Sequence, residues 1–573
     1  MYLLFYGYNA LKQQIFDLKQ IILKPRFVVL NLIYSLLLVS SLAFTPPVNY
    51  PISLAGNFGE PRPNHFHGGI DVRTGMVEGK PVFSVYDGYV SRVTIGLDGF
   101  GIAVYVRHPG GTTSVYCHLK KLVPQLAAIA RKWQYQHETC FADVRLRPTD
   151  FPVASGQFIA VSGNTGASRA PHLHFEMHDT KTWSFLDPLD YLKDYLTDTT
   201  PPIAHAFMAY PVEGEGVFCG SGRKQNYGFS STRLTRTFTA WGKVGFGLWA
   251  NDYMEGSFGI LGVRRTTLTV DGKLVFESDV DSIPVMCNRM VNSWGDYLHY
   301  CRSGVWYMKS YADFGNTLPI LCHYTPDRGV VLFNEERDYN LEYTVSDVFG
   351  NSRSYTFTVR GVPQRIPVKK PASAMNLMSY NRANVFQRPG LTLVLPQGVL
   401  AGDVELAPSV KDGVLSKEWR FYNESHPLFS WANINIKLEA DVPDPRKLYI
   451  ISKQYSDRYM GGTFKDGWVT GRIRDLGLTY TIGYDDEPPV LMQPQIVNGT
   501  MRVVAYDKKC GLKALKAYVD GRFVLFERQD KSNIYVCRLA DAPVRRTNQS
   551  HVLTVICVDN RGNECVRKIQ FNY

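Results

Sequence analysis

The sequence predicts a mainly β protein built from several domains, and three observations lead to this fold class. A chain of 573 residues is too long for one hydrophobic core. Its 34 tyrosines, 48 glycines and 32 prolines favour strands and turns over long helices. No heptad series or low-complexity run interrupts it. The 45% of hydrophobic residues is ordinary for globular domains, so we expect several folded units.

The N-terminal segment carries an export pattern. Lys19, Lys24 and Arg26 precede the mostly apolar run "FVVLNLIYSLLLVSSLAF" (27–44), which ends in small residues. This order of basic, apolar and small residues predicts a signal peptide within 1–45. An uncleaved membrane anchor is the alternative, because 18 residues are just long enough to span a bilayer. If the segment is an uncleaved anchor, it is the only membrane contact that we expect. With either a signal peptide or an anchor, we expect the rest of the chain to be exported.

The net charge of +11 suits an acidic partner, such as nucleic acid, anionic lipid or an anionic cell-wall polymer. The basic residues are scattered, however, and none of them form a run of five. Together with the export pattern, this disfavours nucleic-acid binding.

The cysteines are consistent with export. Ten are present, none in a C-x-x-C pair, which argues against a thiolate zinc site. An oxidising compartment would permit disulfides. We expect one between Cys117 and Cys140, which would pin an inserted segment to the strand that carries His118.

The first folded unit is expected over 50–197. "KPVFSVYDGYVSRVTIG" (80–96) and "GIAVYVRH" (101–108) alternate like strands, and "FLDPLDYLKDYL" (185–196) reads as a short closing helix or turn.

An internal repeat follows. "VDGKLVFE" (270–277) recurs as "VDGRFVLFE" (519–527), and "ANDYMEGSFGI" (250–260) has an echo in "AYDKKCGLKAL" (505–515). A D-x-x-G-N element, expected as a hairpin turn before a last strand, occurs in 346–359 and 558–571. Both copies open on a double proline. We therefore predict two copies of one Ig-like β-sandwich module, over 201–361 and 487–573.

Between the two copies, residues 370–486 form a third β-rich unit with strand-like stretches such as "GLTLVLPQGVL" and "KLYIISKQY". None of these three units holds a catalytic-looking constellation, so we expect scaffold or binding modules.

Candidate metal ligands concentrate in the first unit. "HFHGGID" (65–71) contains an H-x-H pair and an H-x-x-x-D pair, and "HLHFEM" (172–177) contains a second H-x-H. His118 ends another strand-like stretch, "TSVYCHL" (113–119). Imidazoles plus one carboxylate are the ligand set of a zinc ion that keeps an open position for water.

The order "RPNHFHGGIDV", "TTSVYCHL" and "SGNTGASRAPHLHFEM" resembles the lysostaphin-type zinc metallo-endopeptidases, which cut peptidoglycan cross-bridges. The resemblance covers about residues 55–190. It implies Zn²⁺ on His67, Asp71 and His174, with His118 and His172 as metal-free catalytic histidines. It also implies a compact antiparallel β metallopeptidase domain, followed here by the three β-sandwich-like modules. His65 matches no ligand position and is expected beside the metal or in the substrate wall.

Two features depart from the family pattern. Cys117 stands where glycine is common, and the link over 120–157 is longer than usual. We expect an insertion near 120–150 that forms a loop or short helix beside the cleft.

The sequence thus predicts a secreted zinc metallo-endopeptidase that cleaves peptide cross-links of peptidoglycan. The C-terminal modules resemble those in Gram-negative envelope proteins, so we expect the periplasm or cell envelope and an envelope protein as a possible partner. The first alternative is a non-hydrolytic envelope factor that binds cell wall or activates another hydrolase. The second is an adhesion or polysaccharide-binding protein built on the β modules.

Overall fold

The structure is a computed structural model that describes residues 44–573, apart from positions 455, 530 and 548. All but the last two residues of the predicted export segment lie outside the described residues. In the described part of the chain, no helix combines the length and the apolar character needed to cross a membrane.

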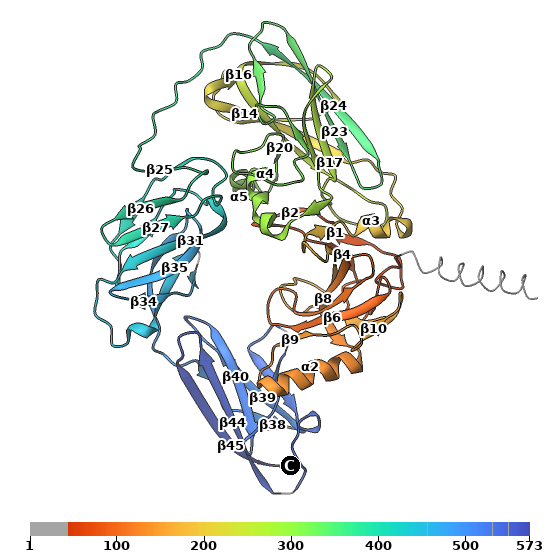
Figure 1. Ribbon diagram of the computed structural model, residues 1–573, viewed down its shortest axis with the longest axis vertical. Coiled ribbons are helices and arrows are strands. Elements are labelled where there is room, and N and C mark those ends of the chain that lie inside the picture. Colours follow the sequence, from red (N-terminus) through yellow and green to blue (C-terminus); the bar gives the residue numbers. More distant parts are fainter. Residues whose placement is uncertain (1–43, 455, 530, 548) are drawn as a thin grey trace, which may run out of the picture.

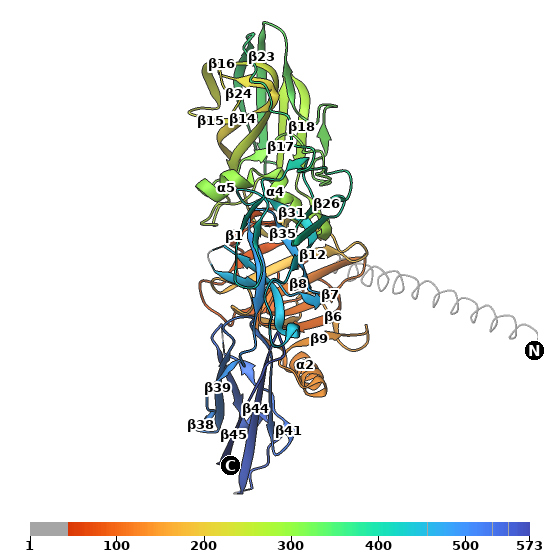
Figure 2. The same ribbon diagram turned by 90° about the vertical axis from the view of Figure 1, so that its left-hand side faces the viewer.

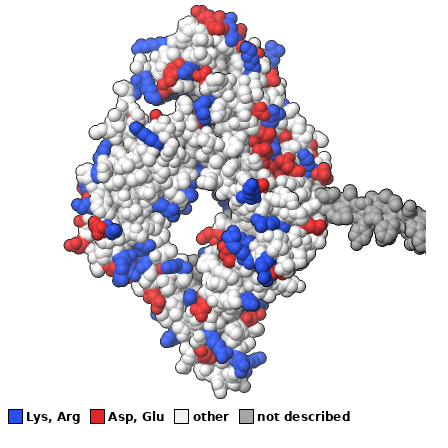
Figure 3. Space-filling model, in the orientation of Figure 1, with Lys and Arg blue, Asp and Glu red and all other residues white. Residues whose placement is uncertain are grey.

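The architecture is mainly β, as predicted. Four β-rich units, named here the N-terminal domain and the first, middle and last modules after the predicted ranges, follow one another around a closed ring (Figure 1). Seen from the side, the units lie close to one plane (Figure 2). The space-filling view shows an opening through the centre of the ring (Figure 3).

The N-terminal domain is built on one large antiparallel sheet. Its main path runs, in spatial order, through β1 (Leu54–Gly56), β4 (Ile70–Arg73), β12 (His172–Asp179), β8 (Thr112–Leu122), β7 (Ile102–Arg107), β6 (Gly88–Ile95) and β10 (Pro152–Val153). The strand predicted over 80–96 is divided into β5 (Pro81–Phe83) and β6, and the strand predicted over 101–108 is β7. The predicted closing helix is present as α3 (Leu189–Leu192) and a 3₁₀ turn, η1 (Lys193–Tyr195).

The insertion forms a helix, α2 (Pro124–His137), followed by β9 (Ala142–Arg145), which pairs with β6. Proline at the first turn suits the helix start, and Glu138 ends the helix in a left-handed conformation. The predicted Cys117–Cys140 disulfide is wrong. Both residues are free thiols, because Cys117 is buried in a small apolar cluster on β8 whereas Cys140 follows the far end of α2.

The first module is a sheet with the order β15 (Gln225–Gly228), β14 (Ile203–Phe218), β16 (Arg233–Asn251), β24 (Ser352–Gly361), β23 (Asp338–Ser346), β17 (Arg265–Val270), β18 (Lys273–Asp279) and β21 (His323–Tyr324). The D-x-x-G-N element is the hairpin between β23 and β24, which confirms the predicted turn. The repeated "VDG" makes the hairpin between β17 and β18, where Asp271 and Gly272 both adopt positive φ, as two-residue hairpins require.

The middle module has two five-stranded sheets. One contains β26 (Asn384–Arg388), β27 (Leu391–Leu395), β31 (Pro427–Lys437), β35 (Trp468–Asp475) and β34 (Thr463–Lys465). The other contains β29 (Ser409–Lys411), β30 (Glu418–Arg420), β36 (Thr479–Tyr484), β32 (Leu448–Lys453) and β33 (Asp457–Tyr459).

The last module repeats the hairpins of the first in a smaller form. One sheet contains β37 (Val490–Leu491), β39 (Thr500–Tyr506), β43 (Ile534–Arg538) and β42 (Glu527–Arg528), and the other contains β41 (Arg522–Phe523), β40 (Leu512–Val519), β44 (Ser550–Asp559) and β45 (Glu564–Asn572). Its D-x-x-G-N element again joins the last two strands, β44 and β45.

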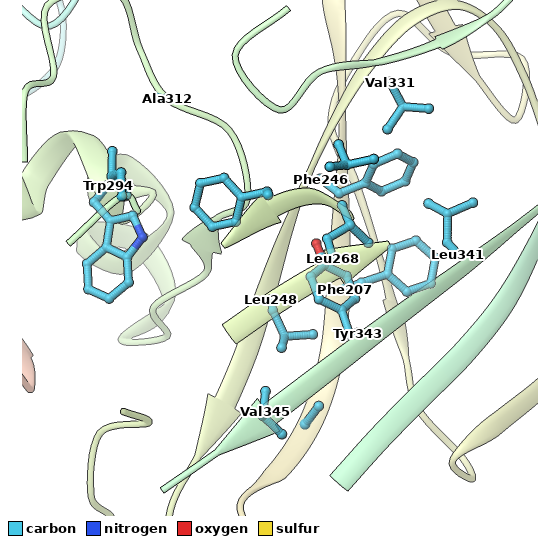
Figure 4. Packing of buried hydrophobic residues seen from close by; sticks show 14 of the residues in the cluster. Phe207, Phe246, Leu248, Leu268, Trp294, Ala312, Val331, Leu341, Tyr343 and Val345 are labelled. Atoms are coloured by element: carbon cyan, nitrogen blue, oxygen red, sulfur yellow. The ribbon is translucent and has the colours of Figure 1, made fainter. Parts of the chain in front are cut away.

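The N-terminal domain and the first module share a continuous core. The aromatic core of the first module, which includes Phe207, Phe246 and Tyr343 (Figure 4), also contains Phe58 and Phe66 from the N-terminal domain. Strand pairing crosses the junction as well, because β13 (Phe185–Leu186) pairs with β19 (Ser282–Ile283). A shared core of this kind holds the two units in one orientation.

The other junctions combine polar and aromatic contacts, and they close the ring. Arg289 in η2 (Val285–Met290) donates to the carbonyl of Leu428 in the middle module at 2.8 Å. Arg561 of the last module donates to the carbonyl of Leu448 at 2.8 Å. The last module returns to the N-terminal domain, where the Tyr518 hydroxyl donates to Glu138 at 2.7 Å.

Candidate metal centre

Strand pairing brings the predicted ligands together. His174 on β12 lies directly opposite Asp71 on β4 and opposite Cys117 on β8. Side chains of directly opposed residues share one face of an antiparallel sheet. Asp71 and His174 therefore meet, and His67 reaches them from the turn between β3 (His65–Phe66) and β4. One ligand atom from each of His67, Asp71 and His174 lies within 4.8 Å of the other two.

Each buried imidazole of this cluster is oriented by a hydrogen bond on its far side. His67 Nδ1 lies 2.6 Å from the carbonyl oxygen of Asn57, which only accepts, so Nδ1 carries the proton. His67 Nε2 then directs a lone pair at Asp71 Oδ1, 3.0 Å away, and lies 3.1 Å from His174 Nδ1. His174 Nε2 donates to Glu176 Oε1 at 2.9 Å, and its Nδ1 lies 2.8 Å from Asp71 Oδ1.

The electrostatics show that this centre attracts a cation. Burial alone would lower the pKa of His174, but its hydrogen bonds to Asp71 and Glu176 outweigh burial and raise that pKa to about 9. Burial lowers the pKa of His67 to about 4. Burial would raise the pKa of Asp71, but the surrounding histidines hold it well below its usual range. Of the two imidazoles among the predicted ligands, His174 is thus the one that holds a proton more readily.

A divalent metal fits in place of that proton. With His174 in its neutral form, the Glu176 bond leaves the lone pair on Nδ1, so two imidazole nitrogens and one carboxylate oxygen face one point. Two nitrogens and one oxygen are the protein ligands of a catalytic zinc that keeps a further position open. Metal binding to such a set releases the proton.

His172 and His118 flank the cluster. His172 Nδ1 bonds the carbonyl of Ala170 at 2.8 Å, which leaves Nε2 3.3 Å from Asp71 Oδ1. His118 Nδ1 bonds the carbonyl of Thr165 at 2.8 Å, and its ring centroid lies 4.9 Å from that of His172. The structure therefore brings all five predicted site residues into one cluster.

Local backbone irregularities aim His118 at the site. Its φ of 56° is unusual for a residue within a strand, and here the register of β8 shifts against β7 and against β11 (Phe158–Ser162). The "SGNTG" turn supplies the carbonyl of Thr165. Gly166 allows this approach, because a Cβ there would lie 2.4 Å from the backbone nitrogen of Gly101.

Sequence reasoning missed the residues that hold the ligands in place. Arg62 Nη2 donates to the second oxygen of Asp71 at 2.8 Å. Glu176 is 2% exposed, and its side chain lies between His174 and His178. Its Oε2 lies 2.7 Å from Nε2 of His178. The pattern "HLHFEMH" signals these last residues, because alternate positions of a strand share a face. Nothing comparable in the sequence signals Arg62. His65 is exposed and bonds the carbonyl of Pro63 instead.

The fold and the site define a metallopeptidase-type domain, and comparisons with known proteins agree. Residues 65–131 match peptidase family M23, and residues 375–485 match the Zu5-like domain. An uncharacterized metalloprotease of Haemophilus influenzae is 31% identical over 135 residues, which are 24% of this chain and 22% of that protein. The chain thus aligns with about a fifth of the length of this curated relative.

Solved structures also align with about a quarter of the chain. A zinc-containing peptidase from Vibrio cholerae is 27% identical, with 24% of this chain and 37% of that chain covered and a TM-score of 0.18. The catalytic domain of lysostaphin from Staphylococcus simulans is 24% identical, with 24% and 89% covered and a TM-score of 0.19. The N-terminal domain is thus similar to peptidase family M23, whose model matches residues 65–131.

Proposed function

We propose that the protein is an exported zinc endopeptidase that cleaves peptide cross-links of bacterial peptidoglycan. The observation that carries this proposal is the convergence of His67 Nε2, Asp71 Oδ1 and His174 Nδ1 on one point, each oriented so that it can offer a lone pair. The match of residues 65–131 to peptidase family M23 supports peptide hydrolysis. The full set of ligand-type residues favours an active enzyme over a non-hydrolytic envelope factor.

A zinc ion held by these three residues would lower the pKa of a bound water and polarise the carbonyl of the scissile peptide. The remaining chemistry belongs to His118 and His172, which both turn a ring nitrogen toward the site. One accepts the proton of the attacking water, and the other donates a hydrogen bond to the oxyanion that develops on the carbonyl. The carbonyls of Thr165 and Ala170 fix the two rings for these roles.

The substrate class and location follow from the sequence. Resemblance to the lysostaphin-type enzymes points to wall peptides, and the net charge of +11 favours an anionic polymer. The basic and apolar pattern within 1–45 supports export to the periplasm or cell envelope of a Gram-negative bacterium. The three C-terminal modules would bind an envelope partner or position the N-terminal domain on the wall.

Digestion of purified peptidoglycan tests the proposal. Zinc-loaded full-length protein should release fragments whose masses correspond to cleaved peptide cross-links, and protein stripped of metal should release none until zinc is restored. His174→Ala should lose both zinc and activity, whereas His65→Ala, in the neighbouring exposed histidine, should keep its zinc. Folded, zinc-replete protein that binds the wall without releasing fragments would favour the non-hydrolytic alternative.

A further inference from the structure

A second cluster of ionisable side chains lies where the N-terminal domain meets the first module. Asp198 precedes β14, Asp252 directly follows β16, and Asp347 directly follows β23. All three are more than nine-tenths buried, with 8%, 4% and 6% of their surfaces exposed. One carboxylate oxygen of each lies within 4.8 Å of the other two. Acidic side chains also gather on the surface around α3 at this junction (Figure 3).

Two of these carboxylates are incompletely satisfied. Asp198 Oδ2 and Asp252 Oδ1 are buried and have no hydrogen-bond partner. The other bonds are ordinary: Asp198 Oδ1 accepts from the Thr200 amide at 3.0 Å, and Asp347 Oδ2 accepts from Asn351 Nδ2 at 2.7 Å. Burial raises the pKa of Asp198 and of Asp252 to about 7. Buried charge without a partner is rare in proteins, so the two orphaned oxygens are candidate ligands for a cation.

No basic side chain of the surrounding cavity neutralises them. A cavity of about 10 Å³, which is room for roughly one water-sized sphere, is lined by Asp252, Asp347 and Arg264 among others. Arg264 is already paired with three other carboxylates, those of Asp187, Asp190 and Asp279.

The last module contains the same three aspartates in the same sequence contexts. They are the D-x-x-P-P of the linker, the A-x-D at a strand end and the D-x-x-G-N of the hairpin, here Asp485, Asp507 and Asp559. One further detail is shared. Asn351 Nδ2 donates to the backbone carbonyl of Asp198 at 3.0 Å, and Asn563 Nδ2 donates to that of Asp485 at 2.8 Å.

The two copies differ in what satisfies the carboxylates. In the last module, Asp485 Oδ2 accepts from the Cys510 amide at 3.3 Å. Asp507 Oδ2 accepts from the amides of Lys509 and Gly511 at 2.9 and 2.7 Å. Backbone donors thus bond one oxygen of Asp485 and one oxygen of Asp507, and neither carboxylate is among the described residues with a buried, unpartnered oxygen. The last module therefore serves as an internal comparison, in which Asp485 and Asp507 cluster with the Cys510 thiol rather than with a third carboxylate.

We propose that Asp198, Asp252 and Asp347 bind a calcium ion at the junction of the N-terminal domain and the first module. All available ligand atoms are oxygens, which hard cations prefer. Three carboxylates can supply up to six oxygens, and calcium accepts six to eight ligands in flexible geometry, whereas magnesium demands a near-ideal octahedron. The ion would tie the linker residue Asp198 to two strand ends of the module.

The acidic cluster is also linked to the metal centre, through Asn57. Asn57 lines the same cavity, and its side chain exchanges two 2.7 Å hydrogen bonds with the backbone of Gly262 in the first module. The backbone carbonyl of Asn57 is the group that orients His67. A calcium ion here would therefore stiffen a junction that positions a ligand of the proposed zinc site.

Calcium binding to the full-length, zinc-loaded protein tests this inference. Equilibrium dialysis with radioactive Ca²⁺ should show one bound ion, and Ca²⁺ should raise the unfolding temperature. Asp252→Asn, nearly isosteric and less repulsive, should fold and bind Ca²⁺ at least about tenfold more weakly, because site affinity follows ligand charge. Asp198→Asn should also fold and should bind Ca²⁺ more weakly by a similar factor. Asp507→Asn, the matched substitution in the last module, should leave binding unchanged.

His174→Ala separates this site from the proposed zinc site, since it should keep calcium binding whether or not the protein is a peptidase. The inference is overturned if the wild type binds no Ca²⁺ at millimolar concentration, which would mean that the carboxylates share a proton instead. It is equally overturned if folded Asp252→Asn binds Ca²⁺ as the wild type does. Tighter binding of Mg²⁺ than Ca²⁺ would overturn the choice of ion.

Discussion

The protein contains two buried clusters of metal-ligating side chains with opposite designs. In the histidine cluster of the N-terminal domain, each ring is held from behind by a carbonyl or by Glu176. In the acidic cluster of the junction, two buried oxygens have no hydrogen-bond partner. The first combines nitrogen and oxygen ligands on paired strands, which suits a fixed, open, catalytic metal. The second offers only oxygens from a linker and strand ends, which suits a structural cation.

Removal of a ligand should have the largest effect in this comparison. His174→Ala should lose most bound zinc and all measurable peptidase activity, because two remaining ligands no longer form a catalytic set. Elemental analysis of the purified variant checks this, with Asp252→Asn as the control that keeps full zinc. Full zinc in His174→Ala would show that the ligand assignment is wrong.

The flanking histidines should affect turnover without affecting metal content. His118→Ala and His172→Ala should keep near-normal zinc while turnover falls about 10²–10⁴-fold, the range for one acid–base group. The double variant should be little worse than the worse single one, since groups that act as a unit are not additive. Steady-state assays on zinc-replete protein measure this. Nearly full activity in His118→Ala would remove that residue from the catalytic set.

Loss of the carboxylate that orients the ligand His174 should have an intermediate effect on zinc affinity. Glu176→Gln removes the carboxylate that accepts from His174, so zinc affinity should fall by about 10–100-fold, as is typical for such partners. Competition with a chromogenic chelator measures the affinity. Glu138→Gln, at the far contact with the last module, is the control. Unchanged affinity in Glu176→Gln would mean that strand pairing alone orients His174.

The smallest expected effect compares the two acidic triads without added cation. Asp252→Asn relieves repulsion among three buried carboxylates, so it should raise the unfolding temperature, by roughly 2–4 °C per kcal/mol of repulsion removed. Asp507→Asn should give no increase, because backbone amides already satisfy that carboxylate. Scanning calorimetry in the presence of chelator compares them. A higher unfolding temperature in both variants would mean that the two triads do not differ.

Much of the site could be predicted from the sequence because its chemistry lies in short motifs. The H-x-x-x-D and H-x-H spacings place ligand-type residues on adjacent strands, and the "SGNTG" turn marks the carbonyl that holds His118. The repeated "VDG" and D-x-x-G-N elements predicted hairpins because turn geometry is a local property of the chain. The Cys117–Cys140 disulfide failed for the opposite reason, since a pairing depends on where distant segments pack.

The sequence by itself thus determined the β class, and it predicted the repeat and the five site residues. Only the tertiary structure decided which groups hold these residues in place. Arg62 donates a hydrogen bond to Asp71, and the Asn57 carbonyl accepts one from His67. The tertiary structure alone showed that the first acidic triad has orphaned oxygens while the second does not. The physical reason is that a side chain's hydrogen-bond partners depend on contacts between distant segments. Asp198 and Asp347 lie 149 positions apart in the sequence, yet their carboxylates share one buried site.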